Sequence, residues 1–428
     1  MKKNDKEMIA ATQIAYLHIL EKAYENIRFS DIKKPYSIKD MILSSVNIGR
    51  AKEIARVYIG EKAEKLSLRE LMKYSDIEQC DKEVFENLTD EMMEWKIADI
   101  HDANGRTGMY GMVIETNEEE AIVAFRGSEN YRKTCNLVND WIQADIGLLK
   151  SPTTIQQAEV ENYQEELIEN GTLNKYSSVA VTGHSLGGNL ASHFTVVAAK
   201  KGREDLFNKI DQTINMDGPG VSLNYLKKYE EDIKIAGEKI DHYKWSLVGS
   251  TLNGIKGERE VFLGIDEDKF KEDMKKHLLY KIIWRHDTRS LKYDENNRAI
   301  RGDQDISSKI IEKVSKKADE KFPTHFTQGM IFLIANVVKH ISGNDEEKNP
   351  VVPKDTRKIH DKILEFIRCV KDDIVEVIRV NGLDTIKGIL EIAGLIGVDQ
   401  KMLDVLPNNA PMLATNTGIT ARIEEDER

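Results

Sequence analysis

The chain has 428 residues and a formal net charge of −11 at pH 7, with 40% hydrophobic and 32% charged residues. This balance is typical of a globular protein with a substantial core, and it excludes wholesale disorder. The acidic charge excludes the basic footprint of a nucleic-acid-binding protein and disfavours general adhesion to anionic membranes. The cysteines Cys80, Cys135 and Cys369 are too scattered for a disulfide framework or a zinc site, and we expect neither metal nor cofactor.

The first 90 residues carry helical patterns. Apolar residues recur at helical spacing from Ile9 to Leu20, and LSLRELMKY repeats the pattern after a serine that is suited to an N-cap. The N-terminus, MKKNDKEMIAATQIAYLHIL, lacks the uninterrupted apolar stretch of a Sec signal peptide. We therefore expect an N-terminal helical segment over residues 1–90, in a protein that is cytoplasmic or is secreted by a route independent of a signal peptide.

The pattern changes near Trp95, where apolar runs separated by turn clusters predict a β-meander. Beyond the meander, helical and strand patterns alternate through IQQAEVENYQEELIENG, SSVAVTG, NLASHFTVVAAKKG, QTINMDGPG and EVFLG. This alternation is typical of a sheet with helices on its faces. The sequence predicts an α/β domain over residues 91–305, built on a mostly parallel sheet with flanking helices.

Strand patterns stop after residue 305, and the rest of the chain reads as helices with polar linkers. The apolar run from Met330 to Val338 is too short for a membrane span, so no transmembrane segment is expected. We expect an all-helical C-terminal domain over residues 306–428. Such helices suit docking of a helical partner, a secretion chaperone or an immunity protein; the alternative is that they cap the sheet.

Residues 177–194 read SSVAVTGHSLGGNLASHF, in which Gly183, Ser185 and Gly187 form a G-x-S-x-G motif. The motif alone is weak, but a short strand precedes it and a helix follows, so Ser185 lies on a strand-to-helix turn. Glycine at the flanking positions removes clashes with the neighbouring strand and helix, and the positive end of the helix favours an oxyanion nearby. This context predicts that Ser185 is a nucleophile.

A serine nucleophile needs a histidine to take its proton and an acid to orient that histidine. In the α/β-hydrolase order the acid and then the histidine follow the serine, and four histidines qualify: His193, His242, His277 and His286. We favour His286, because it follows the aromatic-rich run LLYKIIW and opens the polar loop RHDTRS.

The acid is predicted at Asp217, which lies at the tip of the strand QTINM and before a Gly-Pro-Gly turn. Asp241, ahead of the strand-like run HYKWSLVG, is the alternative acid. Asp287 is too close in sequence to His286 to be an easy partner. A role for Asp217 as a turn former or helix cap stays open at this point.

An oxyanion hole needs two N–H groups directed at the developing negative charge. Leu186, directly after the nucleophile, supplies one of them. The second is expected from the loop after the strand AIVAF, where Arg126, Gly127 and Ser128 follow. A plain strand-to-loop turn is the alternative for that loop.

The motifs AFRGS, NDWIQAD and TGHSLGG, in this order, resemble the class 3 (fungal-type) lipase family and its bacterial relatives over roughly residues 95–300. The resemblance implies an α/β-hydrolase fold, with Ser185 as nucleophile, His286 as base and Ser128 contributing its N–H and hydroxyl to the oxyanion hole. It also implies a segment bracing the oxyanion loop, made of Asp140, Trp141 and Asp145. The family usually carries its acid one strand later than Asp217.

A triad with an oxyanion hole transfers an acyl group to water, so a carboxylic ester is the expected substrate. The resemblance implies lipid esters of glycerolipids, with a lid formed by IGLLKSPTTIQQAEV; plain packing is the alternative for that segment. The layout is similar to bacterial lipase toxins of specialised secretion systems, whose substrates are membrane phospholipids. The alternatives are a housekeeping intracellular esterase, an inactive binding module, a protease and a helical adaptor.

Overall fold

The computed structural model describes residues 2–18, 20, 36–127, 153–269, 284–296 and 298–321. Within them, one eight-stranded sheet takes its strands in chain order from β1 to β8. The strands are β1 (Tyr36–Ser37), β2 (Lys96–Ala103), β3 (Met109–Glu115), β4 (Glu120–Phe125), β5 (Ser178–His184), β6 (Ile210–Met216), β7 (Ile240–Lys244) and β8 (Arg259–Phe262).

The sheet has an antiparallel half and a parallel half. Strands β1 to β4 pair antiparallel, which confirms the predicted meander, and strands β4 to β8 pair parallel. The sheet is therefore mixed, whereas the sequence pattern favoured a mostly parallel one. The difference arises because the meander joins the parallel strands edge to edge instead of forming a separate layer.

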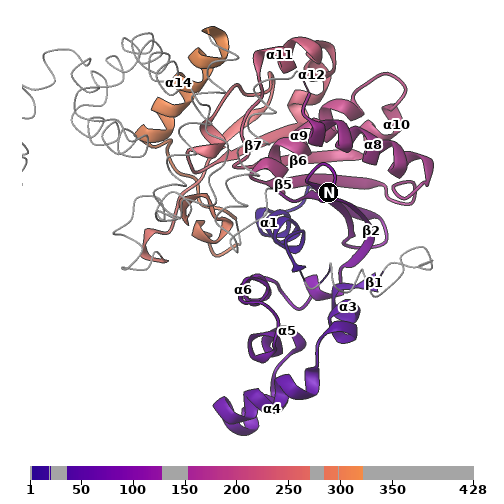
Figure 1. The fold of residues 1–428 in the computed structure, drawn as a ribbon, viewed down its shortest axis with the longest axis vertical. Coiled ribbons are helices and arrows are strands. Elements are labelled where there is room, and N and C mark those ends of the chain that lie inside the picture. The colour runs from indigo at the N-terminus through magenta and orange to yellow at the C-terminus, as the bar shows by residue number, and fades with distance from the viewer. Residues whose placement is uncertain are drawn as a thin grey trace, which may run out of the picture.

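One face of the sheet is covered by the helices that connect the parallel strands (Figure 1). These helices are α8 (Ile155–Glu169), α9 (Leu186–Ala198), α10 (Glu204–Lys209), α11 (Leu223–Lys228) and α12 (Glu230–Ala236). Because the strand order never reverses and crossovers between parallel strands are right-handed, all of these helices fall on the same side. Alternate residues of the strands, such as Val123 and Val181, pack there against Phe194 of α9.

The N-terminal helix α1 (Asp5–Ile14) covers the opposite face of the sheet (Figure 1). Its buried residues Met8 and Ile14 belong to one core cluster with Ile122 and Ile214, which point to that side of their strands. Asn4 and Glu7 start the helix with a capping box. The sheet thus has helices on both faces, as expected for an α/β protein.

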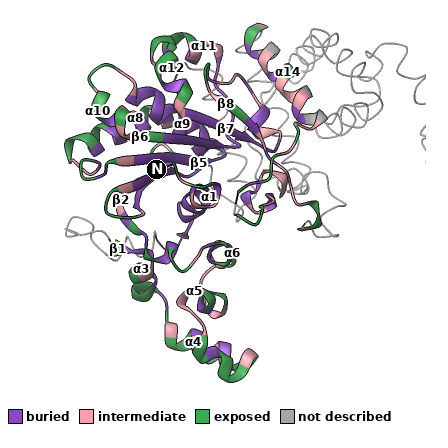
Figure 2. Cartoon of the chain, turned by 180° about the vertical axis from the view of Figure 1, so that it is seen from behind, coloured by how far each residue is buried: buried purple, intermediate pink, exposed green. Residues whose placement is uncertain are grey.

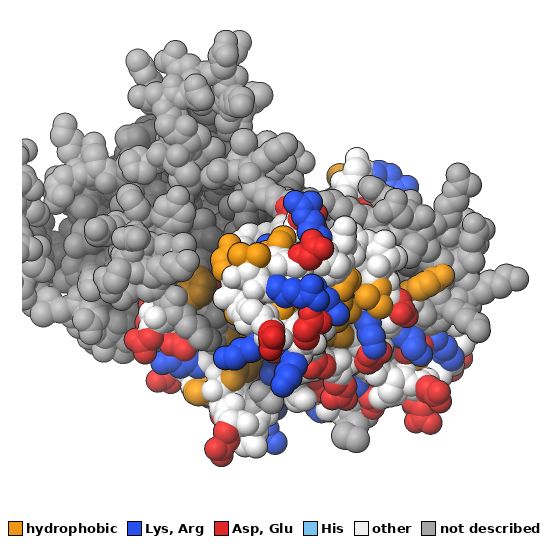
Figure 3. Space-filling model, turned by 90° about the horizontal axis from the view of Figure 1, so that it is seen from below, with side chains coloured by type: hydrophobic (Ala, Val, Ile, Leu, Met, Phe, Trp, Pro, Cys, Tyr) orange, Lys and Arg blue, Asp and Glu red, His pale blue; other side chains and the backbone are white. Residues whose placement is uncertain are grey.

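A group of short helices follows β1 and projects away from the sheet. It comprises α3 (Ile38–Ser45), α4 (Ile48–Ile59), α5 (Leu68–Leu71) and α6 (Gln79–Asn87). Strands β5 and β6 are almost wholly buried, whereas α4 has much exposed surface (Figure 2). Seen from below, apolar side chains on the surface are scattered among acidic and basic ones (Figure 3).

The last described helix, α14 (Ile306–Lys321), docks on the loops beyond β6 and β7. Its Ser315 hydroxyl accepts from the Leu252 N–H at 2.8 Å, and its Asp319 carboxylate accepts from the Leu223 N–H at 2.7 Å. Short 3-10 helices lie at Gly60–Lys65, Met72–Tyr74, Met92–Glu94, Gly237–Lys239, Val248–Ser250, Glu267–Lys269 and Thr288–Ser290. None of the helices in the described ranges is both long and apolar enough to cross a membrane.

The predicted domain boundaries at residues 90/91 and 305/306 stay predictions. Residues 322–428, most of the predicted C-terminal helical domain, lie outside the described residues. The partners predicted for that domain, a helical protein, a secretion chaperone or an immunity protein, therefore stay predictions too.

Candidate active site

Ser185 lies between β5 and α9 in a backbone conformation that L-residues rarely adopt, with φ 58° and ψ −133°. Such a conformation costs about 1–3 kcal/mol and persists only where the surroundings impose it. Here the Ser185 N–H donates to the Met216 carbonyl at 2.9 Å, and its own carbonyl accepts from the Gly188 N–H at 2.8 Å. Ser185 therefore sits on a strained strand-to-helix turn, at the N-terminus of α9.

The two glycines of the motif are required by close backbone approach. A Cβ atom on Gly183 would collide with the backbone of Gly187, and one on Gly187 would collide with the Phe125 carbonyl. The turn can therefore pack against the end of β4 only if both positions lack a side chain.

Asp217 follows β6 directly and is fully buried, also with a positive φ of 51°. Its Oδ2 lies 2.7 Å from His286 Nδ1, although the two residues are 69 positions apart in sequence. The backbone N–H groups of Trp245 and Ser246 donate to its Oδ1 at 2.9 and 3.0 Å. The Ser246 hydroxyl donates to Oδ2 and lies 3.2 Å from His286 Nδ1.

These contacts decide the charge of Asp217. Burial alone would raise the pKa of its carboxyl, but the hydrogen bond and charge of His286, together with the donors on Ser246 and Trp245, outweigh burial. The pKa of Asp217 lies below its ordinary value. Asp217 is therefore ionised at neutral pH, and a carboxylate 2.7 Å from Nδ1 fixes that nitrogen as the protonated one.

Residues 284–286 are helical, and this segment, which carries His286, is anchored to several elements. The imidazole of His184, the residue before Ser185, donates through Nε2 to the His286 carbonyl at 2.8 Å. Burial and the charge of His286 lower the pKa of His184 to about 3, so this ring is neutral. Gln13 of α1 donates to the Thr288 hydroxyl at 2.9 Å. His286 is thus held beside the turn that bears Ser185.

The other titratable candidates have different partners. Asp241 forms a bidentate ion pair with Arg259, at 2.8 and 2.7 Å. His242 lies 3.1 Å from Glu258 and donates to the Gly218 carbonyl at 2.8 Å. Of the two predicted acids, the structure brings Asp217 to His286 and pairs Asp241 with an arginine.

His193 and Asp287 contact groups other than Ser185 and Asp217. His193 is buried on α9 with its Nδ1 2.8 Å from the Tyr225 hydroxyl. Asp287 caps the 3-10 helix that follows His286 and pairs with Arg289 at 2.9 Å. Both groups are engaged away from Ser185.

Part of the predicted site lies outside the described residues. This applies to Ser128 of the oxyanion loop, to the bracing residues Asp140, Trp141 and Asp145, to His277, and to the part of the lid that contains Leu148 and Leu149. Gly127 is described and lies against the Ser185 turn, and Leu186 is the buried first residue of α9. The predicted roles of Ser128 and Asp145 stay predictions.

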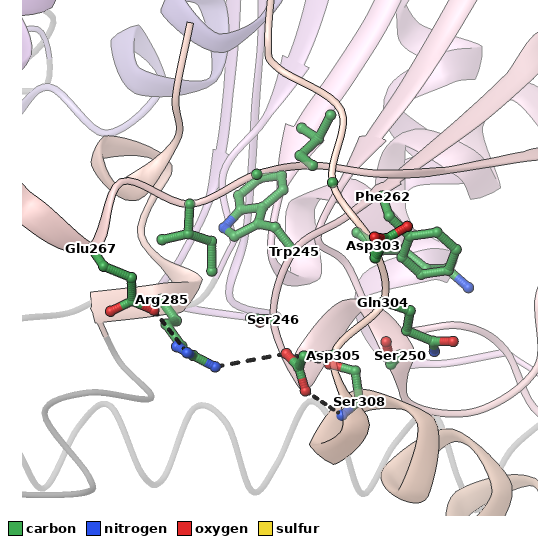
Figure 4. Close-up of a pocket in the computed structure, with 15 residues that line it drawn as sticks. Trp245, Ser246, Ser250, Phe262, Glu267, Arg285, Asp303, Gln304, Asp305 and Ser308 are labelled. Carbon is green, nitrogen blue, oxygen red and sulfur yellow. Dashed lines mark hydrogen bonds and ion pairs between the residues drawn. The ribbon is translucent and has the colours of Figure 1, made fainter. Parts of the chain in front are cut away.

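A cavity of about 210 Å³ adjoins the loop that carries Ser246 (Figure 4). Trp245 forms part of its wall, and Arg285 spans it to Glu267 at 2.7 Å and to Asp305 at 3.7 Å. Because Arg285 directly precedes His286, this ion-pair network is a further anchor for the segment that carries His286.

Sequence reasoning missed two residues that contact the Asp217–His286 pair. Ser246 lies in the run HYKWSLVG, which contains no acid and has no pattern that marks a donor to one. His184 precedes Ser185, whereas the Ser–acid–His order places the base after the nucleophile. Its position next to the nucleophile was the available signal.

Residues 85–260 match the model of the Mbeg1-like family, which is related to lipases. Two solved structures are also similar, both at low identity. M37 lipase is 14% identical with a TM-score of 0.29, covering 54% of this chain and 86% of that one. A lipase from Rhizomucor miehei, solved as a propeptide complex, is 17% identical with a TM-score of 0.29, covering 51% and 68%. No protein with a curated description matches the chain significantly.

Proposed function

We propose that this protein is a serine hydrolase of carboxylic esters, with Ser185 as nucleophile, His286 as general base and Asp217 as the acid that orients it. One observation carries the proposal: a buried carboxylate lies 2.7 Å from Nδ1 of His286, whose carbonyl is hydrogen-bonded to His184, the residue before a serine held at φ 58°. Strain and buried charge of this kind are costly and concentrate at functional sites.

The chemistry follows from the tautomer of His286. With Nδ1–H directed at Asp217, Nε2 carries the lone pair that accepts the Ser185 proton as the hydroxyl attacks the ester carbonyl. The carbonyl oxygen becomes an oxyanion, which the Leu186 N–H at the N-terminus of α9 stabilises together with a second donor that we assign to Ser128. His286 then returns the proton to the leaving alcohol, and water repeats the cycle on the acyl-enzyme.

For the substrate, we propose lipid esters, with glycerolipids and phospholipids as the class. The relation of residues 85–260 to lipases supports this choice. The further proposal of an exported antibacterial toxin rests on the helical sequence pattern of residues 306–428, of which 322–428 lie outside the described residues.

Hydrolysis of p-nitrophenyl butyrate by the full chain tests the proposal. We expect Ser185→Ala to lower kcat by at least about 1,000-fold, because the nucleophile is removed. Ser192→Ala is the matched control, since Ser192 is a buried serine of α9 whose hydroxyl has no partner among the described residues. It should keep kcat within about twofold. If the wild type, Ser185→Ala and Ser192→Ala all hydrolyse the ester at the same low rate, the protein is a binding module without catalytic activity.

The substrate class is tested separately, by mass spectrometry of digests of phospholipid vesicles and of triglyceride emulsions. Lysophospholipid and free fatty acid, formed by the wild type and absent with Ser185→Ala, are expected. If the protein hydrolyses p-nitrophenyl butyrate but releases no fatty acid from phospholipid or triglyceride, it is an esterase and the proposed lipid substrate is rejected.

A further inference from the structure

The segment after α1 reaches the candidate active site. Helix α1 ends at Ile14, and the turn that follows carries Tyr16. The Tyr16 hydroxyl accepts a hydrogen bond from the Gly127 N–H at 2.9 Å, across 111 positions of sequence. Gly127 begins the loop after β4, where the oxyanion hole is expected. Tyr16 lies well outside residues 85–260, the part that matches the Mbeg1-like family.

The surroundings of Gly127 show how near Tyr16 comes to the nucleophile. A Cβ atom on Gly127 would lie 2.7 Å from the Tyr16 hydroxyl, 3.0 Å from Ser185 Cβ and 2.6 Å from the His184 carbonyl oxygen. The phenol and the nucleophile therefore flank the same glycine. The Tyr16 ring also lies 6.3 Å from the His184 ring, centroid to centroid.

A phenol placed there has a use beyond packing. Its oxygen accepts through lone pairs and donates its own proton, so the hydrogen bond from Gly127 does not consume the donor. That same hydrogen bond fixes the position of the phenol oxygen relative to the loop. A hydroxyl held beside the reacting carbonyl costs no reorganisation when negative charge develops, which is the condition for strong oxyanion stabilisation.

We propose that Tyr16 is a catalytic residue of this centre and donates a hydrogen bond to the oxyanion of the tetrahedral intermediate. The inference rests on the proposed hydrolase function. Ser185 Oγ forms a bond to the carbonyl carbon, its proton passes to His286 Nε2, and the carbonyl π electrons move onto the oxygen. They return when the bond to the alcohol breaks and His286 protonates the leaving oxygen. Tyr16 stays protonated throughout.

The substitution Tyr16→Phe removes the hydroxyl and keeps the ring. With p-nitrophenyl butyrate we expect kcat to fall about 100-fold and KM to change less than about threefold, because the lost hydrogen bond belongs to the transition state. Affinity for a butylboronic acid, which forms a tetrahedral adduct with the nucleophile, should fall in parallel with kcat/KM. Tyr58→Phe is the matched control, since Tyr58 of α4 is 75% exposed, and it should behave as wild type.

The outcomes separate the two proposals. An inactive wild type rejects the hydrolase function and this inference with it. An active wild type with Tyr16→Phe at full kcat, or faster, rejects the inference alone; a faster variant would mean that the phenol blocks the site. Loss of kcat with unchanged boronate affinity would reduce Tyr16 to a structural role and overturn the proposal as well. The variant Tyr16→3-fluorotyrosine keeps both the ring and the hydroxyl, so it guards against misfolding as an explanation. Fluorine makes the phenol a stronger hydrogen-bond donor, and we expect kcat to rise by up to about threefold. An unchanged kcat would contradict the proposal.

Discussion

At the scale of single residues, the candidate site is defined by how Asp217 is held. It combines a left-handed backbone, complete burial and a negative charge, each of which destabilises a folded chain in isolation. Two backbone N–H groups, the Ser246 hydroxyl and His286 compensate by hydrogen bonding the carboxylate. A structural turn former would not need this number of donors, so the contacts favour the acid role.

The substitution Asp217→Asn tests that role while keeping the shape of the side chain. We expect kcat on p-nitrophenyl butyrate to fall at least about 100-fold, because the amide cannot stabilise the imidazolium and can present its NH₂ to Nδ1. Asp241→Asn is the control on the neighbouring strand. It breaks the ion pair with the largely exposed Arg259 and should leave kcat within about threefold. Equal losses in both variants would contradict the assignment.

Ser246 should act through Asp217, as a positioning residue. Removing its hydroxyl in Ser246→Ala raises the pKa of Asp217, because one donor to the carboxylate is lost. We expect kcat to fall roughly tenfold and the acid limb of the pH–rate profile to move to higher pH. Ser250→Ala is the control, since Ser250 is a buried serine near the same loop whose hydroxyl has no partner among the described residues. A profile that keeps its shape in Ser246→Ala would reject the positioning role.

Sequence reasoning reached Asp217 and His286 because each follows a readable local pattern, a strand tip before Gly-Pro-Gly and a polar loop after an apolar run. Ser246 and Tyr16 have no such signal. Their contacts join segments 29 and 111 positions apart, and only the packed fold brings those segments together. The sequence separation of Ser246 and His286 does not predict that their side chains lie close together either.

At the scale of elements, α1 completes the core. The helices between the parallel strands all lie on one face of the sheet, which leaves the other face, with Ile122 and Ile214, to be covered. Helix α1 packs on this face. Its first residue, Asp5, accepts a hydrogen bond from the Tyr243 hydroxyl of β7 at 2.8 Å. The helical character of this segment was predictable from periodicity. Its docking on the sheet was not, because the pattern says nothing of the partner surface.

Ile14→Ala tests how much of the core depends on α1. Ile14 is completely buried, and we expect the free energy of unfolding to fall by about 2–4 kcal/mol in urea denaturation. Ile155→Ala makes the same chemical change at a residue of α8 that is 72% exposed, and it should cost less than about 1 kcal/mol. Similar losses in the two variants would mean that α1 contributes little to the core.

At the scale of the whole molecule, buried neutral histidines tie stability to pH. Burial lowers the pKa of both His184 and His193, although Glu161 partly opposes the shift at His193. An unfolded chain binds protons on these rings below about pH 6.5, whereas the folded protein resists protonation of His184 down to about pH 3. Their contribution to stability is therefore complete above pH 6.5 and is lost as the pH falls toward 3.

Urea denaturation at pH 7, 6 and 5 measures this dependence. His184 alone should remove about 2 kcal/mol of unfolding free energy between pH 7 and pH 5. His184→Gln, which cannot titrate, should be less stable at pH 7 and should show a correspondingly smaller loss on acidification. A wild type and variant with parallel pH dependence would contradict the burial of a neutral ring at this position.

The most direct measurement of the central claim is covalent labelling by a fluorophosphonate, followed by mapping of the modified peptide. An activated serine displaces fluoride and forms a stable phosphonyl ester. We expect one label, on Ser185, which is lost in Ser185→Ala and greatly slowed in His286→Ala. A folded wild type that stays unlabelled, or a label on another serine, would contradict it.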